Sequence, residues 1–421
     1  MIDRPASKAP AGAPPVPAAR FATPLNRDVP VAAPGEFEPL QLGEGRVRGV
    51  VPVWPPVVLA PMAGVTNLAF RSMCREYGAG LYVSEMITAR GFLMGNRLTT
   101  LLASSHPDER PRSVQVYGAD PVDLGEMVRM LVDQGVDHVD LNLGCPVPKV
   151  TRTGGGSAIP FKPRLVARLV RAMVHAAGQV PVTVKMRKGL RDDLITWPRA
   201  ALAAQDEGVA AVALHGRTTE ELYAGHADWE SIAAMKQALS VPVLGNGDIW
   251  ECWDALEMMR QTGCDAVVVG RGCLGRPWLF RELAQAFDGH EPDRPPTLGE
   301  VAMVMRDHAE RLVDLFGERM GLRQMRKWTT WYTKGFRGSA AIRGGLHRVE
   351  SMEELIGLLE QLDLEEPFPR QALRAGRAKR GATQRVRLPE GYLDDPEDDT
   401  PPRGPRSEAE IRAWERALSG G

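Results

Sequence analysis

The alternation of short β-rich apolar runs with helical stretches between residues 57 and 270 limits the possible folds more than any other feature. Helical periodicity lies between the apolar runs, most clearly at 122–133, 164–176 and 254–261. Eight β/α units in about 230 residues are typical of a closed (β/α)8 barrel. A doubly wound open sheet stays as the alternative, because periodicity alone does not show closure. The eight predicted strands are 57–60, 81–83, 113–117, 138–143, 182–185, 211–215, 243–246 and 266–270.

The strand pattern stops near residue 292, and only helical periodicity follows it. We therefore predict an α/β fold with a (β/α)8 TIM barrel over 46–292 and a small all-helical domain over 296–366. The predicted helices of the second domain are 301–316, 322–332 and 352–362.

Both ends of the chain have biased compositions. Residues 1–45 hold nine prolines and little apolar periodicity, so we expect a disordered leader. Residues 367–421 are polar and charged, with seven basic residues in 370–387 and six acidic ones in 390–399. We expect this tail to be disordered as well.

Charge is distributed unevenly along the 421 residues. The 52 Lys and Arg nearly balance the 53 Asp and Glu, which gives a net charge of −1. A neutral sum argues against a nucleic-acid partner only if the charge is spread evenly. Here the stretch 319–348 holds eight Lys and Arg and no acidic residue, and acidic residues elsewhere offset it. The net charge therefore does not exclude a nucleic-acid partner.

The five cysteines do not form a Cys-x-x-Cys pair, so we expect neither a disulfide framework nor a metal cluster, and we predict no metal ligands. The start of the chain lacks a basic segment followed by an apolar core, which argues against a signal peptide. No apolar run reaches the roughly 18 residues of a spanning helix. We expect a cytoplasmic, monomeric protein that does not bind membranes.

Polar residues follow the ends of most predicted strands. In a barrel, the carboxyl ends of the strands and the loops after them carry the functional residues. Capping or turn formation would explain any one of these positions, but their repetition predicts a single site. The positions are Pro61, Met62, Ala63, Gln115, Asn142, Cys145, Lys185, Arg187, His215, Arg217, Asn246, Gly247, Asp248, Gly270 and Arg271.

Two of these loops predict an anion site, and one carries a candidate thiol. Asn246-Gly247-Asp248 and Gly270-Arg271-Gly272 follow the seventh and eighth strands, where barrels often bind phosphate through backbone N–H groups. Arg271 could add a charge-assisted contact. Cys145 lies on the loop after the fourth strand, so we interpret it as a functional thiol, whereas the cysteines within helical patterns are interpreted as core residues.

Several of these motifs, in this order, resemble the tRNA-dihydrouridine synthases, and most closely the bacterial DusB branch. The resemblance covers about residues 55–350, both the barrel and the helical domain. The motifs are 59–66 (LAPMAGVT), 115–118 (QVYG), 142–146 (NLGCP), 215–218 (HGRT), 227–229 (ADW) and 246–249 (NGDI).

The resemblance implies that the barrel binds FMN and reduces specific uridines of tRNA, in the D-loop, with NADPH or NADH. By motif match, Pro61, Met62 and Ala63 would line the flavin ring, and Gln115, Lys185 and His215 would contact it. The ribityl-phosphate end would lie at Asn246, Gly247, Asp248, Gly270 and Arg271, and Cys145 would be the proton donor.

The reaction accounts for the thiol. Hydride addition at C6 of uracil places negative charge on C5 and O4, so C5 must receive a proton from the opposite face. A thiol with an ordinary pKa of about 8.5 is mostly protonated at neutral pH and can act as a general acid, whereas a serine hydroxyl is far too weak an acid. A cation beside the flavin, from Lys185 or Arg187, would favour its anionic reduced form.

The basic stretch 319–348 would bind the RNA. Lys and Arg neutralise phosphates, and aromatic side chains stack on unpaired bases. A helix that packs Trp331 and Tyr332 into the core of the domain and exposes a basic face to solvent explains the same pattern. We expect both arrangements to contribute: some aromatic residues pack inward while the charges face RNA. The predicted substrate contacts are Asn142, Arg187, Arg217, Arg323, Arg326, Lys327, Trp331, Tyr332 and Lys334.

Two alternatives remain open at this point. An FMN barrel of the dihydroorotate-dehydrogenase kind would reduce a free pyrimidine and would not need a basic helical domain. A non-catalytic tRNA-binding protein would purify without flavin. The chain also departs from the family at Trp328, where relatives often carry His, which puts one tRNA contact in doubt.

Overall fold

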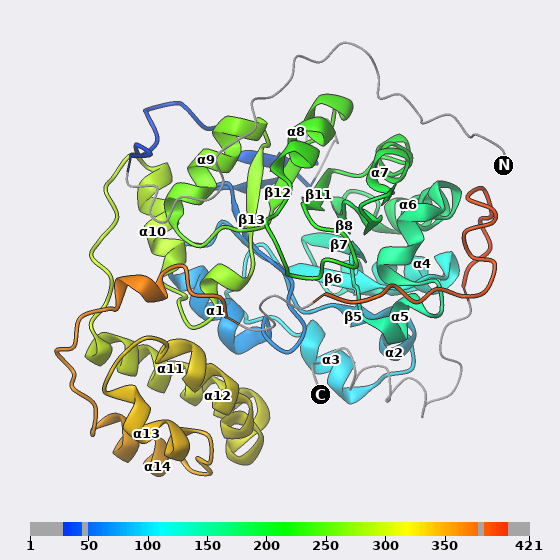
Figure 1. Cartoon of the computed structure of the whole chain (residues 1–421). Helices are drawn as coiled ribbons and strands as arrows, with labels where there is room; N and C mark the ends of the chain where they lie inside the picture. Colours follow the sequence, from blue (N-terminus) through cyan, green and yellow to red (C-terminus); the bar gives the residue numbers. More distant parts are fainter. Residues whose placement is uncertain (1–27, 44–48, 378–382, 403–421) are drawn as a thin grey trace.

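Parallel strands close into a barrel in the computed structural model, which describes residues 28–43, 49–377 and 383–402 (Figure 1). The sheet order is β4-β3-β13-β12-β11-β8-β7-β6-β5, and a parallel bridge from Val83 to Ser113 joins its two ends. The second barrel position is divided between β4 and β5, so eight positions hold nine strands. This ring confirms the predicted TIM barrel and excludes the open sheet. The strands are β3 (Val57–Leu59), β4 (Leu81–Tyr82), β5 (Ile87–Thr88), β6 (Ser113–Tyr117), β7 (His138–Leu143), β8 (Val182–Arg187), β11 (Ala211–His215), β12 (Val243–Asn246) and β13 (Ala266–Val269).

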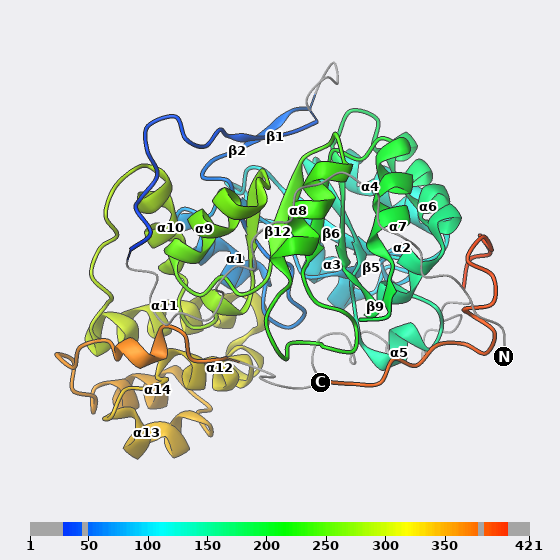
Figure 2. The same ribbon diagram turned by 45° about the horizontal axis from the view of Figure 1, so that its top comes forward.

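Helices surround the ring and begin on the side where the strands end (Figures 1 and 2). Their limits follow capping signals. For example, Glu251 and Asp254 form a capping box at the start of α9, and Gly263 ends it in the left-handed conformation. The helices of the barrel are α1 (Leu68–Glu76), α2 (Ala89–Leu93), α3 (Arg97–Ala103), α4 (Pro121–Asp133), α5 (Pro148–Thr151), α6 (Pro163–Ala177), α7 (Trp197–Asp206), α8 (Trp229–Ala238), α9 (Cys252–Thr262) and α10 (Leu279–Phe287).

The barrel core has two layers. Large apolar side chains fill the space between the strands and the outer helices. Small apolar residues fill the interior, where they pack against the antiparallel hairpin of β1 (Leu40–Leu42) and β2 (Val51–Val53). Residues 28–43 therefore pack on the barrel, contrary to the predicted leader of 1–45, and Glu36 is ion-paired with Arg260 at 2.6 Å. Residues 1–27 lie outside the described part of the chain.

A small helical domain follows the barrel, as predicted. It contains α11 (Leu298–Phe316), α12 (Glu318–Tyr332), α13 (Ser339–Leu346) and α14 (Met352–Leu359). Its core is centred on Trp328, which is fully buried and lies 4.4 Å, centroid to centroid, from Phe70 of α1. Trp328 therefore joins the two domains from the inside, and no surface contact is lost by the absence of a His there.

The tail differs most from the prediction. Residues 367–377 and 383–402 lie against the protein, whereas we expected disorder over 367–421. Arg374 is ion-paired with Glu251 and Asp254, both at 2.6 Å, and the Tyr392 hydroxyl donates to the Gly154 carbonyl at 3.1 Å. Composition did not reveal these specific contacts. Residues 378–382 and 403–421 lie outside the described part.

Shorter elements complete the described chain: a hairpin of β9 (Gly189–Arg191) and β10 (Leu194–Ile195), and 3-10 turns η1 (Gly156–Phe161), η2 (Arg271–Cys273) and η3 (Arg370–Ala372). Within 28–43, 49–377 and 383–402, no helix has the length and apolar character needed to cross a membrane. In the same ranges, no three His, Cys, Asp or Glu side chains are grouped to hold a metal ion.

Candidate active site at the mouth of the barrel

A cavity of about 560 Å³ opens at the carboxyl ends of the barrel strands. It brings together most of the residues that the sequence predicts for the site, from every part of the barrel. The predicted residues that line it are Pro61, Met62, Ala63, Gln115, Asn142, Cys145, Lys185, Arg187, His215, Arg217, Asn246, Gly247, Asp248, Gly270, Arg271, Lys327 and Trp331. Arg323, Arg326, Tyr332 and Lys334 do not line it.

A chain of buried hydrogen bonds fixes the polar floor of this cavity. Asp140 accepts from Thr183 at 2.6 Å and from the Gln115 amide at 2.7 Å. Because the Gln115 nitrogen donates to Asp140, its oxygen faces Asn142, whose amide donates to it at 2.8 Å. The Asn142 oxygen in turn accepts from the Cys145 backbone N–H at 2.9 Å. The position of Cys145 therefore depends on Asp140, which sequence analysis did not identify.

The Cys145 loop folds back tightly on itself. The Ser157 N–H donates to the Cys145 carbonyl at 3.0 Å. Gly156 has a φ of +57°, and a Cβ there would lie only 2.6 Å from the same carbonyl. A side chain at 156 would therefore push the loop away. Cys145 itself is 9% exposed and lines the cavity.

Three basic side chains lie along the β8 and β11 side of the cavity. Burial, and then the charge of Arg187, lower the pKa of Lys185 to about 8, and its Nζ donates to Asn246 Oδ1 at 2.9 Å. Burial, and then Arg187 and other nearby cations, hold the pKa of His215 well below its usual value, so this imidazole is neutral. Arg187 donates to the carbonyls of Gly144 and Thr218 at 3.1 and 2.8 Å. This wall favours anionic groups in the cavity.

The loops after β12 and β13 form a second basic end. Arg217 makes a buried ion pair with Asp248 at 2.7 Å, and Arg271 lies 3.7 Å from the same carboxylate. The Arg271 guanidinium lies over the rings of Tyr223 and Trp250, 4.6 and 5.3 Å from their centroids. Two guanidinium groups thus share one carboxylate, and the excess positive charge faces the cavity.

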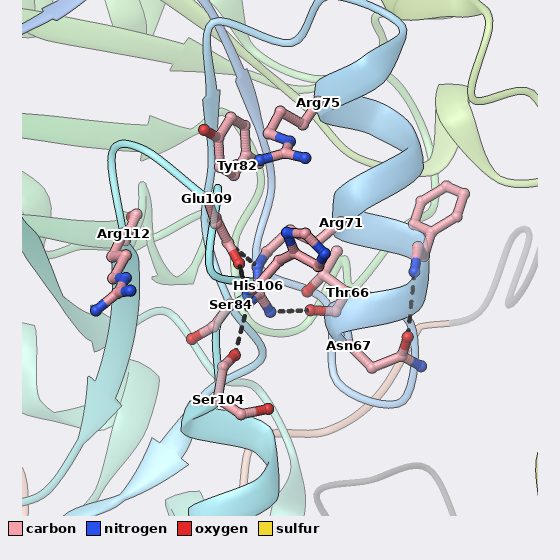
Figure 3. A network of polar contacts seen from close by, with 12 residues as sticks. Thr66, Asn67, Arg71, Arg75, Tyr82, Ser84, Ser104, His106, Glu109 and Arg112 are labelled. Atoms are coloured by element: carbon pink, nitrogen blue, oxygen red, sulfur yellow. Dashed lines mark hydrogen bonds and ion pairs between the residues drawn. The ribbon is translucent and has the colours of Figure 1, made fainter. Parts of the chain in front are cut away.

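The wall made by Pro61, Met62 and Ala63 is supported from behind by a polar network. The Met62 N–H donates to Thr66 Oγ1 at 2.9 Å, and the Thr66 carbonyl accepts from Arg71 at 3.2 Å (Figure 3). Arg71 is itself ion-paired with Glu109 at 2.7 Å, with both side chains at least 97% buried. The network therefore connects the cavity wall to the core beside α1.

The helical domain contributes two side chains to the cavity. Lys327 and Trp331 of α12 line it, and the Lys327 ammonium donates to the Gly64 carbonyl. The N–H of Gly64 donates to the buried Glu85, whose pKa burial raises to about 7. One wall of the cavity thus joins the barrel to the helical domain.

The other predicted substrate contacts lie outside the cavity. Arg323 is exposed, whereas Arg326 and Lys334 are half-buried and donate to the carbonyls of Val349 and Gly376 at 2.9 and 2.6 Å. Tyr332 is 1% exposed and its hydroxyl lies 3.1 Å from His308 Nδ1. The helix therefore directs Tyr332 into the core, which is the second of the two arrangements expected for these aromatic residues and does not favour a contact with RNA.

Sequence analysis also missed cavity residues that lie outside the recognised motifs. Tyr223 and Trp250 hold Arg271, and Gln384 of the tail lines the mouth. Trp250 directly follows the 246–249 motif, which could have identified it. Tyr223 and Gln384 are placed only by tertiary packing.

Comparisons with known proteins agree with this architecture. A family model described as dihydrouridine synthase (Dus) matches residues 58–372. A probable tRNA-dihydrouridine synthase of Mycobacterium tuberculosis (strain H37Rv) is 49% identical over 367 residues, which cover 85% of this chain and 94% of that protein. Its counterpart in Mycobacterium leprae is 47% identical over 377 residues, covering 82% and 98%. The tRNA-dihydrouridine synthase B of Xanthomonas axonopodis pv. citri is 41% identical over 310 residues, covering 74% and 93%. The chain therefore belongs to the dihydrouridine synthase family.

Proposed function

We propose that this protein reduces uridine in tRNA to 5,6-dihydrouridine, with FMN held in the barrel cavity and NADPH or NADH as the electron source. The observation that carries the proposal is the composition of the cavity. It combines a thiol and a basic wall from the barrel with Lys327 and Trp331 from the helical domain. Such a combination suits a cavity that holds an anionic cofactor and an RNA base at the same time.

The cavity fits a flavin mononucleotide. Arg271, Gly270 and Gly247 would hold the phosphate, because the guanidinium there is only partly neutralised by Asp248. Lys185, Gln115 and His215 would contact the ring, beside the wall of Pro61, Met62 and Ala63. When bound, the flavin supplies the hydride that adds to C6 of the uracil ring.

Cys145 would hold the proton for C5 of the ring. Its backbone N–H is fixed by Asn142 and its carbonyl by Ser157, so the backbone that carries the thiol is held in place at the cavity. The protonated thiol donates, and a cysteine thiolate remains until solvent returns the proton. Arg187, which donates to the carbonyl of the neighbouring Gly144, would stabilise that thiolate.

RNA would approach the cavity over α12. Arg323 is exposed on this helix, and Trp331 at the mouth offers a ring on which an unstacked base can pack. An enzyme that reduces a free pyrimidine would not need these residues. The family assignment favours the tRNA reaction over reduction of a free pyrimidine and over non-catalytic tRNA binding. With tRNA as substrate, we expect the enzyme to act in the cytoplasm, as a monomer.

The test uses the purified full chain with FMN, NADPH or NADH, and tRNA transcripts that lack modifications. We expect dihydrouridine to form at defined positions, mapped by primer extension after mild alkali, which opens the saturated ring and stops the polymerase there. Cys145→Ala is the control, because it should retain flavin absorbance and lose the product. Protein that holds flavin and oxidises NADPH but reduces a free pyrimidine instead of tRNA would refute the proposal.

A further inference from the structure

The tail segment 383–402 lies along the rim of the candidate active site, beyond residue 372, where the family match ends. It runs past α5 toward α6 in both views (Figures 1 and 2). The Gln384 amide donates to the carbonyls of Pro146 and Thr219 at 2.6 and 3.1 Å, beside Cys145. Farther along, the buried Tyr392 contacts Gly154 of the same loop. The segment is thus anchored at two points.

Beyond Tyr392, three consecutive acidic residues bind four cations of the barrel. Glu397 pairs with Arg164 at 2.9 Å and with Arg199, and Asp399 pairs with Arg168 at 3.1 Å. Asp398 pairs with Lys162, whose ammonium holds the pKa of that carboxyl well below its usual value. We call Lys162, Arg164, Arg168 and Arg199 the rim cations.

The rim cations lie on the same side of the barrel as the cavity. Lys162, Arg164 and Arg168 are at the start of α6, and Arg199 is at the start of α7. Helices of a barrel begin where the preceding strands end, which is the side on which the cavity opens. Lys162 also ends the loop that starts at Cys145. An RNA whose base enters the cavity would therefore lie close to these four charges.

The acidic contacts can be exchanged for other anions. The side chains of Arg164, Arg199 and Arg168 are 67%, 60% and 40% exposed. Exposed pairs of this kind each contribute little, because water and salt screen them. The three exposed guanidinium groups, already oriented toward carboxylate oxygens, can equally bind phosphate oxygens, for which they are well suited. Lys162 is only 7% exposed and adds its charge from behind them.

We propose that the rim cations are a second binding site for the phosphates of the RNA substrate, and that Glu397, Asp398 and Asp399 occupy this site as competing anions. RNA must displace Glu397 and Asp399 from the three exposed arginines to bind there, while Tyr392 and Gln384 keep the rest of the segment in place. The charge of Asp398 opposes the same phosphates from its pair with Lys162. The inference rests on the proposed function, because it takes tRNA to be the substrate of the neighbouring cavity.

The test neutralises the three acids without changing their shape, as Glu397→Gln/Asp398→Asn/Asp399→Asn in the full chain. Its matched control is Glu390→Gln/Asp394→Asn/Asp395→Asn, which removes three charges of the same tail that make no ion pair with the barrel among the described residues. Binding of tRNA is measured directly by fluorescence anisotropy in the inactive Cys145→Ala background. We expect the first variant to bind about threefold to tenfold more tightly than the control. Its affinity should also fall more steeply with salt, because more phosphates are paired.

A second pair of changes tests the cations. Arg164→Gln/Arg168→Gln should weaken tRNA binding in the neutralised tail and remove most of the gain. If the neutralised tail binds tRNA no more tightly than its control, or if the arginine changes leave the gain intact, the rim proposal is wrong. If the starting protein does not bind tRNA at all, both the rim proposal and the proposed function are wrong.

Discussion

Removing the Arg71 guanidinium should destabilise the protein strongly, because it leaves buried groups unpaired. Arg71 and Glu109 form a bidentate pair with distances of 2.7 and 3.2 Å, at 1% and 3% exposure (Figure 3). The same guanidinium donates to the carbonyls of Thr66 and Ser104 at 3.2 and 2.8 Å. Arg71→Met keeps much of the packing volume but leaves a buried carboxylate and two carbonyls without this donor.

Breaking a buried pair on one side costs about 3–5 kcal/mol, because the remaining charge is desolvated and unpaired. We therefore expect Arg71→Met to lower the free energy of unfolding by about that amount. The double variant Arg71→Met/Glu109→Gln leaves no buried charge, so its cost should be well below the sum of the two single costs. Arg75→Met, one turn farther along α1, is the matched control. Arg75 is half-buried and donates to the Asp108 carbonyl, so its loss should cost about 1 kcal/mol.

The measurement is urea-induced unfolding of Arg71→Met, Glu109→Gln, the double variant and Arg75→Met beside the starting protein, followed by tryptophan fluorescence. Since Thr66 also holds Met62, flavin titration should show weaker binding in Arg71→Met than in Arg75→Met. The reasoning is refuted if Arg71→Met costs no more than the control, or if the double variant costs as much as the two single changes together.

Three further changes test other parts of the structure. Cys145→Ser should lower the rate of dihydrouridine formation by about 10²–10⁴-fold and leave flavin absorbance unchanged; near-normal turnover would remove the thiol from the mechanism. Trp328→Ala should cost about 3–5 kcal/mol in urea unfolding, because this fully buried ring packs on Phe70 across the domain boundary, and a loss below about 1 kcal/mol would contradict that packing. Burial raises the pKa of Glu85 from 4.5 to about 7, so the folded state binds this proton more tightly and stability falls as pH rises from 4.5 to 7. Glu85→Gln should therefore gain up to about 3 kcal/mol at pH 8 and nothing near pH 4, and an equal effect at both pH values would exclude this cause.

The barrel could be predicted from sequence because most of its strands are short, largely apolar runs followed by polar residues. In Val182–Arg187, which is almost entirely buried, Val182, Val184 and Met186 are apolar, and the charged Lys185 and Arg187 appear near the mouth. The helix Ser339–Leu346 was missed because Gly344 and Gly345 interrupt its apolar pattern. A Cβ at Gly345 would lie 2.9 Å from Leu358, so close packing of two helices explains that glycine better than helix propensity does.

The order of the tail and the orientation of the aromatic residues could not be predicted, since both depend on long-range contacts. Tyr392 contacts Gly154, which lies 238 positions earlier in the chain. No local pattern in an acidic, proline-containing segment predicts such a contact. Trp331 and Tyr332 are neighbours in sequence, yet one lines the cavity and the other is in the core. Only the rotation of α12 against α11 decides which ring faces the mouth.

This rotation has a consequence for how the two domains work together. Lys327 and Trp331 face the cavity because Trp328 and Tyr332, on the neighbouring face of the same helix, are held by His308 and Phe70. Since Lys327 contacts Gly64 beside Pro61, Met62 and Ala63, a change in the seating of α12 would move this wall of the cavity. If RNA binds the helical domain as proposed, its binding and the shape of the cavity would be coupled through this one helix. A helical domain that served only as a separate RNA anchor would not need to complete the cavity.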